Sequence, residues 1–179
     1  MITGYHTQEF RCDEEDLESP IICNAANAWL GKGYYFWVEE EYAKYWGEDY
    51  KIFYPKDPGY YSIYKANLKN DKFLDTVFNE EGYNFFIDSI NEAYIELRKR
   101  KNSITLLNVN RFLADNVWNR LGITGIVYDD KPVNKEEKGR NSSMIPPLYY
   151  RKRIQIVCFD IKLINNFALH LERQSKSKS

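Results

Sequence analysis

The sequence of 179 residues is poor in cysteine and histidine. Its three cysteines, Cys12, Cys23 and Cys158, include no C-x-x-C pair. An odd number without paired spacing argues against a disulfide framework and against a structural zinc site. The two histidines, His6 and His170, are too few for a multi-histidine metal centre. We therefore expect reduced cysteines and a protein that works without a metal.

Long apolar runs are also missing. No stretch approaches the roughly 20 apolar residues that a membrane-spanning helix needs, and residues 1–10 lack the features of a secretory signal. We expect a cytoplasmic protein with no membrane partner. Hydrophobic residues make up 44% of the chain and aromatic residues 16%, which excludes disorder for most of it. The length predicts one domain, at residues 1–173, followed by a disordered basic tail at 174–179.

Several common catalytic motifs are absent. Gly31 and Gly33 form a G-x-G, but neither the third glycine nor the long following helix of a dinucleotide-binding fold is present. The sequence also contains no P-loop, no G-x-S-x-G elbow and no H-E-x-x-H. These absences disfavour a Rossmann dehydrogenase, a P-loop NTPase, an α/β-hydrolase and an HExxH metalloprotease.

The net charge is only −1, but the charges are unevenly distributed. Residues 1–50 carry a balance of −8, and the remaining residues carry +7. Basic side chains cluster at 98–101 and at Arg151, Lys152 and Arg153. Such a distribution suits a nucleic-acid surface, but it equally suits solvated helix ends, and the sequence leaves both alternatives open.

Hydrophobic periodicity predicts short strands that alternate with helices, which is an α+β class. Gly47 and Gly122 are expected to end two of the helices, and Asn108 is a candidate cap. The expected strands lie at 2–6, 60–68, 123–128 and within 149–161, and a glycine-hinged turn leads into a short strand within 31–37. The expected helices lie at 38–47, 83–101 and 109–121, and a long loop at 129–147.

Three spaced segments carry the residues that point to a function. The first is Tyr5-His6-Thr7, the second is GKGYYF at residues 31–36 with the helix that follows it, and the third is QIVCFDI, which begins at Gln155. In this order the segments resemble the His–Tyr–Glu class of ADP-ribosyltransferases, which includes diphtheria toxin and the poly(ADP-ribose) polymerases. GKGYYF carries most of the likeness, and the three segments together span nearly the whole chain.

The resemblance implies a fold of split antiparallel β-sheets around an NAD cleft, with flanking helices. It implies NAD as co-substrate, no metal, and a catalytic set of His6, Tyr35 and Gln155. Beside these residues, Thr7 and Gly33 would contact the cofactor. A second stacking aromatic on the helix would be Tyr45, or Trp46 under a shift of one residue.

The chain departs from the family pattern at two positions. Thr7 stands where the family has glycine, which crowds the place where backbone groups hold the nicotinamide carboxamide. Gln155 stands where the family has glutamate. Its carbonyl oxygen still accepts a hydrogen bond from a ribose hydroxyl, but it brings no charge and cannot act as a base. The resemblance therefore implies transfer of a single ADP-ribose, or, as the alternative, an inactive module that binds NAD, ADP-ribose or a partner.

The acceptor implied by the resemblance is a macromolecule, either nucleic acid or protein. The uneven charge favours nucleic acid, with Arg151, Lys152 and Arg153 as acceptor-binding residues. A compact enzyme of this class resembles intracellular bacterial toxins of toxin–antitoxin and phage-defence systems, which makes an antitoxin an expected partner.

Overall fold

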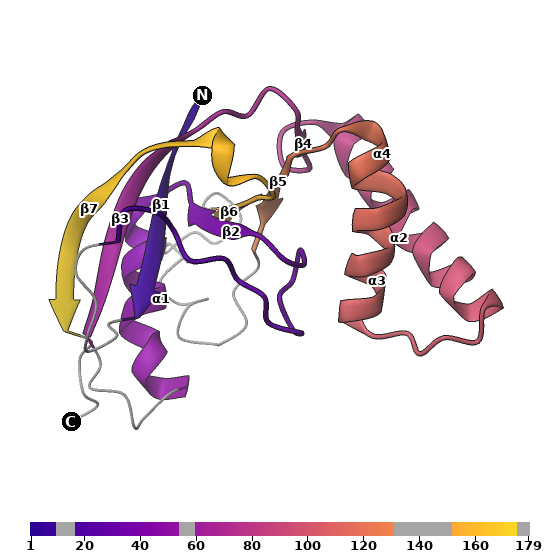
Figure 1. Cartoon of the computed structure of the whole chain (residues 1–179), viewed down its shortest axis with the longest axis horizontal. Coiled ribbons are helices and arrows are strands. Elements are labelled where there is room, and N and C mark those ends of the chain that lie inside the picture. The colour runs from indigo at the N-terminus through magenta and orange to yellow at the C-terminus, as the bar shows by residue number, and fades with distance from the viewer. Residues whose placement is uncertain (10–16, 54–59, 131–151, 175–179) are drawn as a thin grey trace, which may run out of the picture.

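The computed structural model describes residues 1–9, 17–53, 60–130 and 152–174. One mixed sheet of seven strands runs through these residues, in the order β4-β5-β6-β2-β1-β3-β7 (Figure 1). Among the described strands, only β4 and β5 pair in parallel; the other neighbours are antiparallel. The strands are β1 (Ile2–Glu9), β2 (Tyr34–Trp37), β3 (Tyr60–Leu68), β4 (Phe73–Asp75), β5 (Gly125–Asp129), β6 (Ile154–Cys158) and β7 (Ile164–Gln174).

The helices follow β2 and β4 in the chain. Helix α1 (Glu40–Phe53) follows β2, and α2 (Glu80–Lys99) follows β4. A second helical segment consists of α3 (Leu106–Leu113), the π-helical turn η1 (Ala114–Trp118) and the short α4 (Asn119–Leu121). A 3-10 turn, η3 (Ile161–Leu163), precedes β7. Within the described ranges, no helix has the length and apolarity to cross a bilayer.

All the helices that pack on the sheet cover the same face, which we call the helix face. Directly paired residues of neighbouring strands point to one side of a sheet, so Tyr5, Trp37 and Gln155 share this face. Helix α1 packs there against a core around Trp37 and Ile63. Further along the sheet, α2 and the α3–η1–α4 segment pack against a second core that includes Ile126, Val157, Phe86, Leu113 and Trp118.

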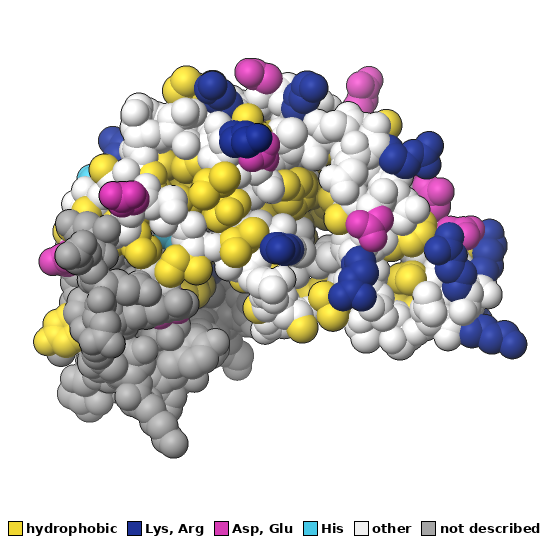
Figure 2. All heavy atoms as spheres, viewed as in Figure 1, with side chains coloured by type: hydrophobic (Ala, Val, Ile, Leu, Met, Phe, Trp, Pro, Cys, Tyr) yellow, Lys and Arg dark blue, Asp and Glu magenta, His cyan; other side chains and the backbone are white. Residues whose placement is uncertain are grey.

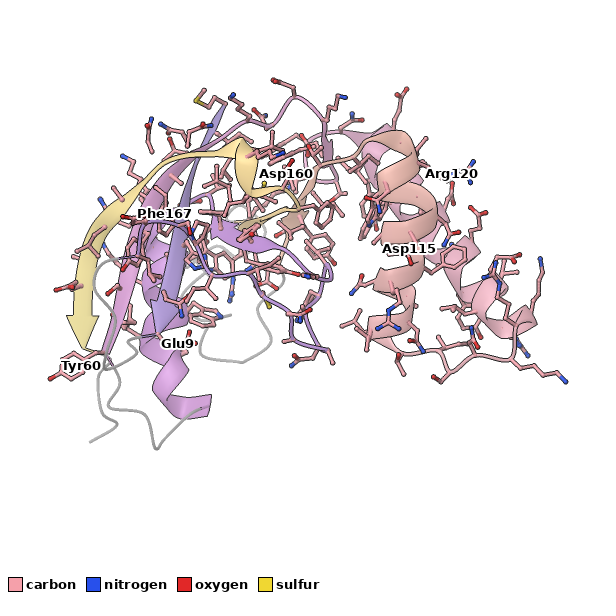
Figure 3. All side chains as sticks on the ribbon, in the orientation of Figure 1. Glu9, Tyr60, Asp115, Arg120, Asp160 and Phe167 are labelled. Atoms are coloured by element: carbon pink, nitrogen blue, oxygen red, sulfur yellow. The ribbon has the colours of Figure 1, made fainter. Side chains whose placement is uncertain are left out.

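The opposite face carries its own core, built from Phe36, Ala66, Leu68, Val127 and Ile156. Strand β7 contributes to it through Ile164 and Phe167, which pack against this core. The Phe167 ring also stacks on Tyr64 with centroids 4.7 Å apart. Figure 3 labels Phe167 on β7 and Glu9 at the end of β1. Two register shifts between β3 and β7 accompany this packing.

The α+β class predicted from the sequence is confirmed, and so is the strand at Tyr60–Leu68. Gly122 ends its helix in the left-handed conformation, with φ +67°. The cap of that helical segment is Thr105, which accepts from the Asn108 N–H, and not Asn108 itself. Strands β4 and β7 were not predicted. Gln174, expected in a disordered tail, pairs with Tyr60; residues 175–179 and most of the expected loop at 129–147 lie outside the described residues.

Gly47 does not end α1 as predicted, since the helix continues to Phe53. A Cβ built at Gly47 would overlap the ring of Tyr61, which is 2% exposed. The glycine therefore allows the helix to approach β3 closely.

We expect Gly47→Ala to lower the free energy of unfolding by about 1–2 kcal/mol. Alanine is the better helix former, but the steric cost of overpacking the core is larger than this gain. Urea denaturation of the purified variant measures this. The cost should shrink when Tyr61 is also replaced by leucine; an unchanged cost in that background would contradict the steric explanation.

Candidate active site

The three segments singled out in the sequence form neighbouring strands. Strands β6, β2 and β1 lie side by side at the centre of the sheet. β2 and β6 pair along four residues, but β1 and β2 share a single Cα pair, Tyr5 with Trp37. Continuing that antiparallel register would pair Thr7 with Tyr35, and this pair is not formed. The sheet is therefore almost divided between β1 and β2.

The side chain of His6 occupies this division. Its Nδ1 lies 2.8 Å from the backbone oxygen of Tyr35. Because a carbonyl only accepts, Nδ1 carries the hydrogen, and the imidazole takes the place of a bond that the β1–β2 ladder would make. The ring is 6% exposed and lies on the opposite face, with its centroid 5.5 Å from that of Phe36. His6 therefore connects β1 to β2 through its side chain.

The second ring nitrogen faces Gln8. Nε2 lies 3.3 Å from Oε1 of that amide. A neutral imidazole that donates through Nδ1 accepts at Nε2, so this contact needs either a protonated ring or an amide turned to present its NH₂ group. Burial lowers the pKa of His6 below its usual 6.5, more than its hydrogen bonds to Tyr35 and Gln8 raise it. The neutral ring with the turned amide is thus the favoured state.

This lowered pKa makes the stability dependent on pH. The unfolded chain binds a proton at His6 near pH 6.5 while the folded chain does not, so the contribution of His6 is complete above that pH and decreases as pH falls. We expect the stability advantage of the wild type over His6→Gln to be smaller at pH 5.5 than at pH 7.5, by up to about 1.4 kcal/mol per pH unit. Urea denaturation at both pH values measures the difference. An advantage that grows on acidification would contradict the burial of a neutral ring.

Tyr35 lies on the helix face and anchors the loop that precedes β2. Its hydroxyl donates to the backbone oxygen of Gly31 at 2.6 Å and accepts from the N–H of Leu30 at 3.1 Å. Burial raises the pKa of Tyr35, so the phenol stays neutral. Its ring packs with the core beneath α2 and α3. The tyrosine therefore fixes the glycine-rich loop relative to the sheet.

Gln155 lies where the two helix-face cores meet. It pairs with Trp37 on one side and with Tyr128 on the other. Trp37 belongs to the core under α1, and Tyr128 packs against the core under α2 and α3. We call this row, Tyr128–Gln155–Trp37, the Gln155 seam. It presents a half-buried carboxamide between two aromatic residues, which the sequence alone did not reveal.

Arg153 is buried in the structure, which departs from the expectation of an exposed acceptor-binding cation. Its side chain is buried and forms an ion pair with Asp130 at 2.8 Å. Its guanidinium also lies over the rings of Trp37 and Tyr42, at 5.1 and 5.6 Å from the centroids. Arg153, which directly precedes β6, therefore connects this strand to the core under α1.

The two neighbouring basic residues differ from Arg153. Lys152 lies near the surface, where its Nζ donates to the backbone oxygen of Val77 at 3.3 Å and sits 5.3 Å from the ring centroid of Phe78. Arg151 lies outside the described residues. An acceptor-binding role for Lys152 and Arg151 stays a prediction.

The remaining predicted cofactor residues have packing roles in the structure. Thr7 donates from Oγ1 to the backbone oxygen of Ala43 at 2.8 Å and so ties β1 to α1. A Cβ at Gly33 would overlap Val157, so a glycine is needed where this backbone approaches β6. Tyr45 packs in the core under α1, and its hydroxyl bonds to Glu41, whereas Trp46 is 40% exposed.

The structure thus brings Tyr35 and Gln155 to one face and places the ring of His6 on the other. Tyr35 and Tyr45 belong to different cores, so the described packing does not set them around a common space. Within the described ranges, no group of three or more His, Cys, Asp or Glu side chains is placed to hold a metal ion. Comparisons of the chain with protein-family models, curated proteins and solved structures found no match.

Proposed function

We propose that the protein is an NAD-consuming mono-ADP-ribosyltransferase. The observation that carries the proposal is the arrangement of the three sequence segments: they are distant in the chain, yet their strands β6, β2 and β1 are adjacent, at a place where the sheet nearly divides. The finer fold that we propose is a sheet split at this junction, with the coenzyme on the helix face beside the Gln155 seam.

The chemistry needs little from the protein beyond positioning and charge stabilisation. The bond between the ribose C1′ and the nicotinamide nitrogen breaks, and its electron pair leaves with nicotinamide, which needs no proton because it departs from a cationic state. Positive charge develops on the ribose, as in glycoside hydrolysis. A lone pair of the acceptor forms the new bond to C1′, and the acceptor proton passes to water.

The side chains of the helix face suit these requirements. The carboxamide oxygen of Gln155 accepts a hydrogen bond from a ribose hydroxyl, and the electron-rich ring of Tyr35 favours a cationic pyridinium nearby. We assign His6 a positioning role, through its bond to the Tyr35 carbonyl. This differs from the direct ribose contact that the family resemblance implies.

Incubation of the purified protein with NAD labelled in its adenylate part, together with a cell lysate, tests the proposal. We expect label in a macromolecule and free nicotinamide in equal amounts. Digestion with nuclease or protease then identifies the acceptor class; loss of label with nuclease is expected if the basic residues around Lys152 serve the acceptor. In bacteria we also expect growth arrest on expression, relieved by Tyr35→Ala, as for a toxin controlled by an antitoxin. The absence of both labelled macromolecule and free nicotinamide would contradict the proposal.

A second candidate is a binding module of the same fold without transfer. It is favoured because polar groups that a transferase would direct at its substrate already form hydrogen bonds within the protein. The Tyr35 hydroxyl bonds to the loop, both His6 nitrogens face protein atoms, and Thr7 Oγ1 bonds to α1. Calorimetry separates the candidates. Binding of ADP-ribose while NAD stays intact for hours would support the module.

A further inference from the structure

A cavity of about 350 Å³ lies between the loop before β2 and the α3–η1–α4 segment, and its described lining includes no residue of the Gln155 seam. The loop lines it with three alanines and Leu30, and the helical segment lines it with Ala114 and Trp118. Figure 2 shows the surface hollowed between the sheet part and the helical part of the molecule, with Lys and Arg side chains beside the hollow. Its volume lies at the lower end of the range for small-ligand sites.

Hydrogen bonds and close packing hold the two walls of the cavity together. Asn110 on α3 donates from Nδ2 to the backbone oxygens of Ala28 and Trp29, at 3.0 and 3.2 Å. Gly31 adopts φ +83°, and a Cβ there would come within 3.1 Å of the Asn110 Cβ. The Tyr35 hydroxyl holds the same loop from the sheet side. The cavity is therefore preformed, because its walls are fixed by bonds rather than by a side chain that fills it.

The helical wall contains an irregularity at the cavity. The α-helix changes to a π-helical turn at Ala114–Trp118, and both end residues of that turn line the cavity. π-helical turns are rare and occur frequently at functional sites. Ala114 is small and half-buried, so this part of the wall leaves space where a larger side chain would close it.

The polar groups that line the cavity indicate the chemical class of ligand that would fit it. Lys32 and Arg111 are both exposed cations on its lining, and among the residues that the structure describes no acidic side chain lines it. No ion pair recorded in the described part of the chain engages either cation. Asn24 and Asn119 add carboxamides, which offer the donor and acceptor that the edge of a nucleobase matches. Trp118 and Phe159 supply the apolar aromatic part.

We infer that this cavity is a nucleotide site that holds a nucleoside monophosphate unit, with the base against Trp118 and Phe159 and the phosphate between Lys32 and Arg111. The bound unit is either a free mononucleotide or one half of a dinucleotide such as NAD, and both present the same chemical groups to the cavity. The inference stands whether or not the protein transfers ADP-ribose.

Titration calorimetry of the whole protein with AMP, adenosine, inorganic phosphate and NAD tests the inference. We expect AMP to bind at least about ten-fold more tightly than adenosine or phosphate alone, because it engages both the cations and the apolar wall. Arg111→Gln should weaken AMP binding about ten-fold. Ala114→Leu should abolish it by filling the space. NAD bound more tightly than AMP, with the same sensitivity to Arg111→Gln, would identify a dinucleotide as the source.

Arg120→Gln is the matched control. Arg120 lies on the same helical segment, outside the lining, as labelled in Figure 3, and its replacement should leave AMP binding unchanged. Arg111→Gln keeps the test valid if Ala114→Leu does not fold, since Arg111 is exposed. The inference is overturned by absence of AMP binding at millimolar concentration, by phosphate binding as tight as AMP binding, or by equal weakening in the Arg111 and Arg120 variants.

Discussion

Gln155→Glu is expected to raise the rate of NAD consumption about ten-fold. A hydrogen bond to a charged group contributes about 1.5–3 kcal/mol, against about 0.5–1.5 kcal/mol for a neutral pair, and a difference near 1.4 kcal/mol in the transition state is ten-fold in rate. The new carboxylate would lie in the Gln155 seam, between Tyr128 and Trp37. There it would stabilise positive charge on the ribose more strongly than the carboxamide does. Release of nicotinamide from saturating NAD measures the rate.

The matched control is Gln155→Met, which keeps the length of the side chain and removes its acceptor. We expect this variant to consume NAD more slowly than the wild type. Thermal melting of both variants separates a catalytic effect from a folding defect. A rate in Gln155→Glu equal to that of Gln155→Met would show that this side chain does not face the reacting ribose.

Arg153→Ala is expected to lower the free energy of unfolding by about 3 kcal/mol or more. Removing one partner of a buried ion pair typically costs about 3–5 kcal/mol, because the remaining charge stays away from water and loses the attraction of the removed group. The side chains of Arg153 and Asp130 are 9% and 16% exposed, so solvent screens the pair little. The variant also loses the contact of the guanidinium with Trp37 and Tyr42. Urea denaturation at neutral pH measures the change.

Lys152→Ala provides the comparison for Arg153, because it removes a neighbouring cation near the surface. We expect it to cost no more than about 1 kcal/mol. In contrast, Lys152→Ala should weaken labelling of a nucleic-acid acceptor in a salt-dependent way. Similar small costs in both variants would contradict the structural role of Arg153.

Local patterns predicted several elements of the fold well. The Tyr- and Ile-rich run at Tyr60–Leu68 predicted β3, and Gly122 predicted the end of α4, because both signals depend on neighbouring residues. Gly47 carries the same local signal as Gly122. Its role is set instead by Tyr61, a residue on another element, so the prediction that α1 ends there was wrong.

The candidate site shows the same limit. The sequence identified His6, Tyr35 and Gln155, and the structure places their strands side by side, but strand pairing decides which face each side chain occupies. A residue before or after His6 would point to the helix face. The burial of Arg153 depends on Asp130, Trp37 and Tyr42, and the cavity depends on Asn110 meeting Ala28, contacts that no spacing along one chain predicts.

Release of free nicotinamide from NAD by the purified wild-type protein, followed by chromatography, tests the central proposal most directly. We expect release that continues over many turnovers, falls in Tyr35→Ala and rises in Gln155→Glu. The contradicting result is NAD that remains intact with the folded wild type and with folded Gln155→Glu, in the presence of a cell lysate as a source of acceptors.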